Sequence, residues 1–204
     1  MAFINLKDKV IQAKIVYYGP GRCGKTTNLE YIYDKCRTQV NSEMVTVKTQ
    51  GDRTLFFDFF PFDMGKINGY DVKIQLYTVP GQVKYNSTRR LVLKGVDGVV
   101  FVADSAVERR SKNIISIRNL EENLTLYNKN IREIPLVIQY NKRDLVKQGI
   151  EVLDVETLES DINAELKAPS FEASAVEGQN VILTLKKIIY YTMSSLEKQL
   201  KQEQ

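Results

Sequence analysis

The residues best suited to chemistry lie in the segment GPGRCGKT, residues 19–26, which fits the pattern G-x-x-x-x-G-K-[S/T]. The glycines of this pattern let the backbone curl so that its N–H groups point at phosphate oxygens. Lys25 then reaches the β- and γ-phosphates of a nucleotide, and the hydroxyl of Thr26 binds Mg²⁺. The segment follows an apolar run and opens a helical pattern, a position that a chance glycine turn would not explain. The residues predicted to contact a nucleotide here are Gly19, Gly21, Arg22, Cys23, Gly24, Lys25, Thr26 and Thr27.

A second polar segment, NKRD at residues 141–144, closes the apolar run LVIQY. The carboxylate of Asp144 can accept hydrogen bonds from both N1–H and the exocyclic amine of guanine, and adenine offers no such pair of donors. Asn141 is then expected to brace the loop, and the stem of Lys142 to cover the face of the base. Surface turns often carry four polar residues after a strand, but this one follows the phosphate-binding segment by about 115 residues, which favours guanine recognition.

The composition excludes several kinds of catalysis. Histidine is absent from the 204 residues, which excludes Ser-His-Asp and Cys-His mechanisms and every metal site with a histidine ligand. Cys23 and Cys36 are predicted to be reduced thiols rather than a disulfide. The net charge of +4 is small and dispersed, so we expect no nucleic-acid partner. The length favours one domain over residues 1–204.

The ends of the chain show neither a targeting nor an anchoring signal. The start, MAFINLKDK, has charges where a signal peptide needs an apolar run, and no stretch reaches the length of a transmembrane helix. The start is not Met-Gly, and the end, KQLKQEQ, has no cysteine, so the usual lipid acceptors are missing. We therefore expect a cytoplasmic protein with no lipid anchor.

Apolar runs alternate with segments of helical periodicity along the whole chain. The predicted strands are residues 11–18, 54–60, 70–79, 98–103, 135–140 and 170–173. The predicted helices are residues 25–37, 83–94, 112–128, 155–166 and 180–201. The last helix shows the pattern most plainly, with apolar residues three and four apart at Ile182, Leu185, Ile189, Met193 and Leu196.

This alternation predicts a doubly wound α/β domain, in which ligands bind at the carboxyl ends of the parallel strands. Runs such as VVFVA and PLVIQY are apolar throughout, as expected for parallel strands that are covered by helices on both faces. Strands 54–60 and 70–79 are the exception. The nine residues between them are too few for a crossover helix, so this pair is predicted to be an antiparallel hairpin.

Four segments in order, the phosphate-binding segment, the turn PGQ at 80–82, NKRD and ASA at 173–175, resemble those of Ras-like small GTPases. The segments DRTLFFDF, LYTVPGQV and LKGVDGVVFVADS are similar in sequence to those of the bacterial gliding-motility GTPases. The resemblance extends from Phe3 to about Leu145, and beyond it only the fold and the ASA loop contribute. It implies a Ras-like P-loop GTPase with a mostly parallel six-stranded sheet, one antiparallel edge strand and helices on both faces. It also implies a switch that hydrolyses GTP.

The resemblance assigns roles to further residues. Backbone groups of Ser174 and Ala175 are expected to contact O6 of guanine, and Gly81 is expected to border the nucleotide. Gln82 matches the glutamine that orients the attacking water, and Thr54 matches the threonine that binds Mg²⁺ and senses the γ-phosphate.

Two features near these residues leave alternatives open. Arg53 is expected to neutralise charge in the transition state, as an arginine at this position does in the family; the alternative is a solvated loop arginine. Thr78 stands where Ras-like proteins usually carry an aspartate that holds Mg²⁺ through water. Either Thr78 through water or Asp58 on the neighbouring strand compensates, and the alternative for Asp58 is a charge that protects a sheet edge. Hydrolysis is expected to persist at a low intrinsic rate.

The segment FFDFFPF, residues 56–62, holds five of the eight phenylalanines. Their side chains either all enter the core or form a partner surface at the sheet edge. The resemblance implies that this strand slides when the switch closes, and that a homodimeric roadblock-type protein stimulates hydrolysis. It further implies polarity or motility effectors, a position at a cell pole and a monomer in isolation. Two rival functions stay open. One is a scaffold that holds GTP without hydrolysing it, which Thr78 favours and Gln82 opposes. The other is a P-loop kinase or ATPase, which the NKRD segment opposes.

Overall fold

The computed structural model describes residues 3–5, 8–36, 45–49, 53–67, 69–82 and 85–202. For residues 3–5, 45–49, 53–64, 67, 200 and 202, only the backbone is described. No helix in this part of the chain combines the length and the apolar character that crossing a membrane requires.

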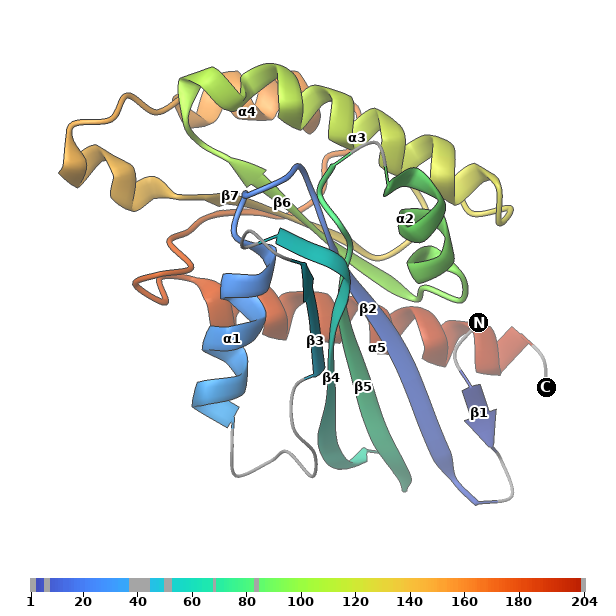
Figure 1. Ribbon diagram of the computed structural model, residues 1–204. Coiled ribbons are helices and arrows are strands. Elements are labelled where there is room, and N and C mark those ends of the chain that lie inside the picture. Colours follow the sequence, from blue (N-terminus) through green and yellow to red (C-terminus); the bar gives the residue numbers. More distant parts are fainter. Residues whose placement is uncertain are drawn as a thin grey trace.

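One mixed sheet forms the centre of the fold (Figure 1). Its parallel strands are β2 (Val10–Tyr18), β5 (Tyr70–Thr78), β6 (Gly98–Asp104), β7 (Leu136–Asn141) and β8 (Ser170–Glu172). Its antiparallel strands are β1 (Phe3–Asn5), β3 (Val45–Thr49) and β4 (Arg53–Ile67). The strands lie in the order β3-β4-β5-β2-β6-β7-β8, and β1 pairs with β2. Ligand sites are expected along the edge where β2, β5, β6, β7 and β8 all end, because these strands run in one direction.

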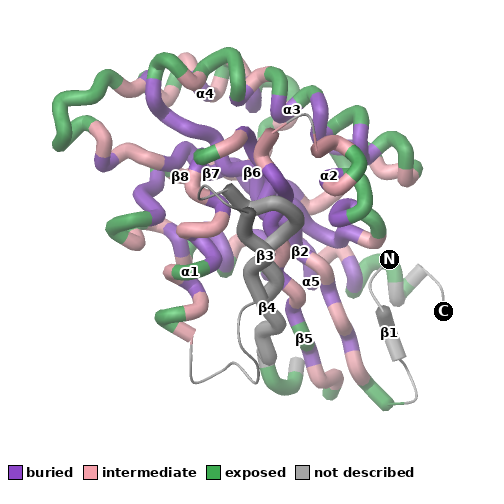
Figure 2. Tube along the Cα trace, viewed as in Figure 1, coloured by how far each residue is buried: buried purple, intermediate pink, exposed green. Residues whose placement is uncertain are grey.

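Helices cover both faces of the sheet. The α-helices are α1 (Lys25–Cys36), α2 (Asn86–Leu93), α3 (Arg110–Thr125), α4 (Val155–Ile162) and α5 (Val181–Gln202), and two short 3₁₀ helices are η3 (Val107–Arg109) and η4 (Arg143–Gln148). Strand β2 sends Ile15 and Tyr17 to the core under α1 and α5, and Val16 and Tyr18 to the core under α2, α3 and α4. The buried centre of the sheet between these two layers is visible in Figure 2. The predicted Ras-like α/β fold is confirmed, but the sheet of the described residues has eight strands rather than the six expected, because β1 and β3 extend it.

The hairpin prediction is confirmed, because β4 and β5 pair antiparallel and Phe59 lies opposite Tyr77. The edge prediction is wrong, since β3 pairs with the outer side of β4. Strand β3 consists largely of β-branched residues, VTVKT, which favour a strand. It gives hydrogen-bond partners to backbone groups that an edge strand would leave open. The phenylalanine side chains at 56–62, and with them the predicted partner surface, lie outside the described residues.

Helices α2 and α4 are several residues shorter in the structure than predicted. Helix α2 begins at Asn86 rather than at residue 83, and residues 83 and 84 lie outside the described part of the chain. Helix α4 ends at Ile162 rather than at residue 166. The reason lies in Asn163, whose side chain accepts a hydrogen bond from the N–H of Ala168 (2.9 Å) and donates one to its carbonyl (2.9 Å). An asparagine that satisfies nearby backbone groups in this way competes with helical hydrogen bonds.

Candidate functional site

A pocket of about 440 Å³ lies at the carboxyl edge of the sheet. We call it the P-loop pocket. Four segments meet there: the loop from β2 to α1, the turn after β5, the loop after β7 and the loop after β8. Its described lining residues are Gly21, Arg22, Gly24, Lys25, Thr26, Thr27, Val79, Gly81, Gln82, Tyr85, Asn141, Lys142, Asp144, Leu145, Gln148, Ala175 and Val176. All four sequence segments that we singled out therefore contribute to one site.

The loop from β2 to α1 depends on two glycines. Gly19 has φ = 148°, and an added Cβ would lie 2.2 Å from the carbonyl oxygen of Val102. Gly24 has φ = 95°, and an added Cβ would lie 2.3 Å from Nδ2 of Asn141. Backbone with positive φ and such close neighbours requires glycine. The two glycines thus fix the path of the loop between β6 and the segment after β7.

Lys25 is buried, and its ammonium group folds back over this loop. Nζ donates to the carbonyl oxygens of Pro20 (2.6 Å) and Gly19 (3.2 Å) and lies 3.5 Å from Sγ of Cys23. Burial raises the pKa of the Cys23 thiol above its ordinary value, so it stays protonated at neutral pH. Cys23 and Cys36 are both free, as predicted. The cation of Lys25 therefore sits in the loop where a phosphate is expected.

Asn141 joins two loops at the base of the pocket. Its Nδ2 donates to the carbonyl oxygen of Cys23 (2.7 Å), and its Oδ1 accepts from the N–H of Ala175 (2.8 Å). One buried amide thus connects the phosphate-binding loop with the ASA loop, which is the bracing role expected for Asn141.

The N–H groups of the ASA loop already have protein partners. That of Ala175 donates to Asn141, and that of Ser174 donates to the carbonyl oxygen of Gln179 (3.3 Å). The hydroxyl oxygen of Ser174 accepts from the N–H of Glu177 (3.2 Å). A contact of these backbone groups with O6 of guanine stays a prediction.

Asp144 supplies the one carboxylate among the described residues that line the pocket. Its side chain is buried, with the residue 8% exposed, and Oδ1 has no hydrogen-bond partner among the described residues. Burying a carboxylate oxygen without a donor is costly, so native proteins rarely leave one unpaired. Asp144 therefore presents an unsatisfied acceptor beside the pocket.

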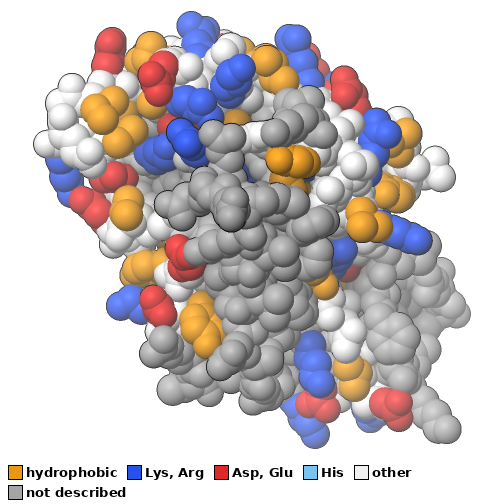
Figure 3. Space-filling model, viewed as in Figure 1, with side chains coloured by type: hydrophobic (Ala, Val, Ile, Leu, Met, Phe, Trp, Pro, Cys, Tyr) orange, Lys and Arg blue, Asp and Glu red, His pale blue; other side chains and the backbone are white. Residues whose placement is uncertain are grey.

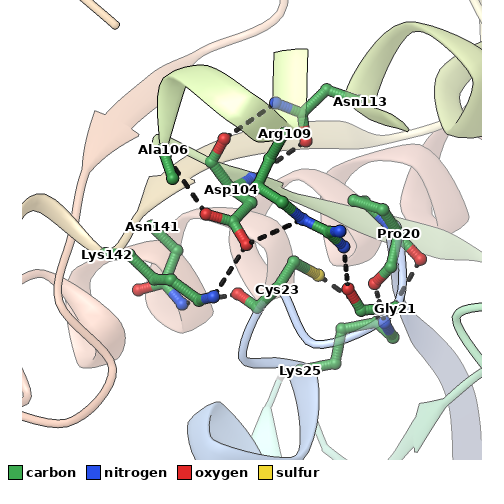
Figure 4. Close-up of polar contacts among 11 residues, drawn as sticks. Pro20, Gly21, Cys23, Lys25, Asp104, Ala106, Arg109, Asn113, Asn141 and Lys142 are labelled. Carbon is green, nitrogen blue, oxygen red and sulfur yellow. Dashed lines mark hydrogen bonds and ion pairs between the residues drawn. The ribbon is translucent and has the colours of Figure 1, made fainter. Parts of the chain in front are cut away.

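Asp104 is a functional candidate that the sequence analysis missed. It is fully buried at the end of β6, and its Oδ2 lies 2.7 Å from Nζ of Lys142 and 3.5 Å from Nε of Arg109 (Figure 4). Arg109 in turn donates from Nη2 to the carbonyl oxygen of Gly21 (2.5 Å). Asp104 thus links the lysine of NKRD to the phosphate-binding loop. An acidic residue that ends the apolar run VVFVAD was the signal that could have revealed it.

The turn PGQ packs directly against the phosphate-binding loop. An added Cβ on Gly81 would lie 2.3 Å from Cα of Gly21 and 2.6 Å from the carbonyl oxygen of Pro20. Gln82 lines the pocket beside them. Thr78 is fully buried at the end of β5. It is not among the described residues that line the pocket, whereas the next residue, Val79, is. Only glycine fits at position 81 in this arrangement.

Three residues with predicted metal or catalytic roles, Arg53, Thr54 and Asp58, lie in β4, but their side chains are outside the described part of the structure. Phe59 pairs with Tyr77 in the antiparallel ladder, so the backbone of Asp58 lies near that of Thr78. The proposed roles of Arg53, Thr54 and Asp58 stay predictions, because their side chains are not described.

The family model of the ADP-ribosylation factor family, Arf, matches residues 1–192. The chain therefore belongs to this family of Ras-like small GTPases, and it is a GTPase. It is similar to the mutual gliding-motility protein MglA of Myxococcus xanthus (strain DK1622), with 47% identity over 198 residues that cover 97% of this chain and 99% of that protein. It is also similar to the Ras-related protein Rab-11B of Dictyostelium discoideum, with 31% identity over 185 residues that cover 88% of this chain and 74% of that protein. The resemblance to Ras-like GTPases, and within them to MglA, is confirmed.

Proposed function

We propose that this GTPase is a guanine-nucleotide switch that cycles between GDP-bound and GTP-bound forms in the P-loop pocket. The observation that carries the proposal is the buried carboxylate oxygen of Asp144, which has no partner among the described residues. Guanine would supply two N–H donors to this carboxylate, and adenine would supply no such pair. Asn141 and Lys142, held by Cys23, Ala175 and Asp104, fix the loop that carries Asp144.

The phosphates and the metal would lie at the N-terminus of α1. Thr26 lines the pocket beside Lys25, and we assign its hydroxyl as a ligand of Mg²⁺ because the pattern has a threonine at this position. Among the described residues, no cluster of three acidic or cysteine side chains could hold a metal ion by itself. Mg²⁺ usually keeps waters and takes substrate phosphates as ligands, so it needs few protein ligands. Thr54 is the second proposed protein ligand, with Thr78 or Asp58 acting through water.

Hydrolysis needs an oriented water and a positive charge near the γ-phosphoryl oxygens. We assign the first task to Gln82, which lines the pocket next to Gly81. We assign the second to Arg53, which begins β4 next to Thr54. The intrinsic rate is low until a partner holds both residues toward the nucleotide.

The similarity to MglA, the mutual gliding-motility protein, supports our proposal for the biological setting. We propose that this chain regulates bacterial polarity and motility and acts at a cell pole as a cytoplasmic monomer. Its activating partner is a homodimeric, roadblock-type protein of the MglB kind, and its GTP-bound form engages polarity or motility effectors.

The test starts with the nucleotide that copurifies with the protein, followed by single-turnover GTP hydrolysis with and without the roadblock-type partner. Arg53→Ala and Gln82→Ala should bind GTP and the partner almost normally, yet lose most stimulated turnover, since a positioned arginine contributes roughly 10³–10⁵ in rate. Arg118→Ala, an exposed arginine on α3, is the matched control. Equal affinity of the native protein for ATP and GTP would overturn guanine specificity. Full stimulated turnover of Arg53→Ala would instead place the arginine on the partner.

A further inference from the structure

A second pocket, of about 500 Å³, lies behind the wall that the turn PGQ and the phosphate-binding loop form together. We call it the α2–α3 pocket, because Arg89 of α2 and Lys112 of α3 line it. It shares Gly21, Arg22, Gly81 and Gln82 with the P-loop pocket. The two pockets are thus neighbours on either side of the Gly21–Gly81 contact.

The lining of the α2–α3 pocket is strongly basic. Arg22, Arg89, Arg109 and Lys112 all line it, and none of its described lining residues carries a carboxylate. Among the described residues, only Arg109 of these four has an acidic partner, the buried Asp104, at 3.5 Å. On the face drawn in Figure 3, Lys and Arg side chains gather near the loop that joins β2 to α1. Such a concentration of one sign of charge in a concave site attracts anions.

Arg89 is the deepest of these cations. Its residue is 0% exposed, its Nη2 donates to Oγ of Ser116 (3.0 Å), and its guanidinium carbon lies 4.3 Å from the centre of the Tyr18 ring. Nε and Nη1 have no hydrogen-bond partner among the described residues. Burial lowers the pKa of Arg89 below its ordinary value. A buried guanidinium with two unpartnered nitrogens is satisfied when an anion enters the pocket and reaches them.

We propose that the α2–α3 pocket binds inorganic phosphate, the anion that GTP hydrolysis releases on the other side of the shared wall. A phosphate has acceptor oxygens for the unused donors of Arg89 and negative charge for Arg22 and Lys112. No carboxylate among the described lining residues would repel it. The inference rests on the proposed nucleotide site, because that site is the source of the phosphate.

The experiment titrates inorganic phosphate into the GDP-loaded full chain, with chloride keeping the ionic strength constant, and measures heat by calorimetry. We expect saturable binding of phosphate that Lys112→Glu weakens by about tenfold or more, since it replaces attraction of the anion by repulsion at the pocket. Lys186→Glu, the same charge change at an exposed position of α5, should leave the affinity within about twofold. Arg89→Met should abolish binding, and the Lys112→Glu result stands by itself if Arg89→Met fails to fold.

GDP affinity and GTP turnover are measured on the same samples to separate this inference from the proposed function. Normal GDP binding and turnover without saturable phosphate binding would overturn the phosphate site alone. Equal phosphate affinity in Lys112→Glu and the native protein would also overturn it, because any bound phosphate would then lie elsewhere. If Lys112→Glu left phosphate binding unchanged but weakened binding of the roadblock-type partner, the pocket would be a site for an acidic protein segment instead.

Discussion

At the base end of the P-loop pocket, the side chain of Asn141 joins two loops by hydrogen bonds, whereas at the phosphate end Gly21 and Gly81 pack backbone against backbone. The base end is a network of directed polar contacts, and Lys142 is held by the buried Asp104. At the phosphate end, the turn PGQ and the phosphate-binding loop approach each other closely because no side chain lies between them.

We expect this difference to separate nucleotide recognition from switching. Buried hydrogen bonds that satisfy each other hold one geometry, and we expect this to preorganise the carboxylate of Asp144 for the proposed contact with the base. A contact between two glycines has no side chain that interlocks the loops, so the turn can leave the phosphate-binding loop with little loss of packing. We expect changes at the base end to affect affinity and changes at the phosphate end to affect turnover.

The largest effect is expected at the base end. Asp144→Asn should weaken GTP and GDP binding by about 2–5 kcal/mol, or roughly 30- to 4,000-fold, because a charged acceptor for two donors is lost. It should also improve binding of xanthine nucleotides, whose O2 would meet the new amide donor. Competition binding with labelled GDP measures both. Asp161→Asn on α4 is the control outside the pocket, and native-like GDP affinity of Asp144→Asn would refute the assignment.

Asn141→Ala should cost about 1–3 kcal/mol in the free energy of unfolding, because the buried Cys23 carbonyl and Ala175 N–H lose their shared partner. GDP affinity should fall as well, since both loops lose their common support. Urea denaturation with and without GDP checks this. A variant with native stability and native GDP affinity would show that the base end is not held by this amide.

Gly81→Ala probes the phosphate end. The added Cβ would meet the backbone of Gly21 and Pro20, so the turn must move away at an overpacking cost of about 1–3 kcal/mol. We expect GTP turnover to fall by roughly 5- to 150-fold because Gln82 moves with the turn. GDP affinity should change less than about threefold, since Asp144 and Asn141 are untouched. A change in GDP affinity as large as the change in turnover would end the proposed separation of the two ends.

The smallest effect is expected outside both ends, at the N-cap of α4. Asp154 accepts a hydrogen bond from the N–H of Thr157 (2.6 Å), and this bond lowers the pKa of its carboxyl below the ordinary 3.8. Because the folded pKa is the lower one, the contribution to stability is present above about pH 4 and is lost as pH falls through the folded value. Asp154→Ala should therefore lower the melting temperature slightly at pH 7, and by less at pH 3, while GDP binding stays native. Asp154→Asn keeps a capping oxygen and should retain most of the stability at pH 7.

Much of the fold could be predicted from the sequence, because its signals are local. The apolar runs at β2, β6 and β7 and the helical periodicity of α5 locate these elements within one or two residues. The five residues of β3 were missed, since a short β-branched segment has no distinguishing period and depends on pairing with β4. The end of α4 was also misplaced, because the hydrogen bonds of Asn163 with Ala168 override the helical pattern.

The sequence by itself determined the class of the protein and predicted the residues of its site. Motifs such as GPGRCGKT and NKRD carry their chemistry in residue types and spacing, and these motifs identify a small GTPase without coordinates. The tertiary structure alone decided which side chains complete the site. Asp104 and Arg109 reach Lys142 and Gly21 across long stretches of chain, and Arg89 is buried beside Tyr18 from another element. Such contacts depend on how strands and helices pack, and no local pattern records the distance between residues that are far apart in the chain.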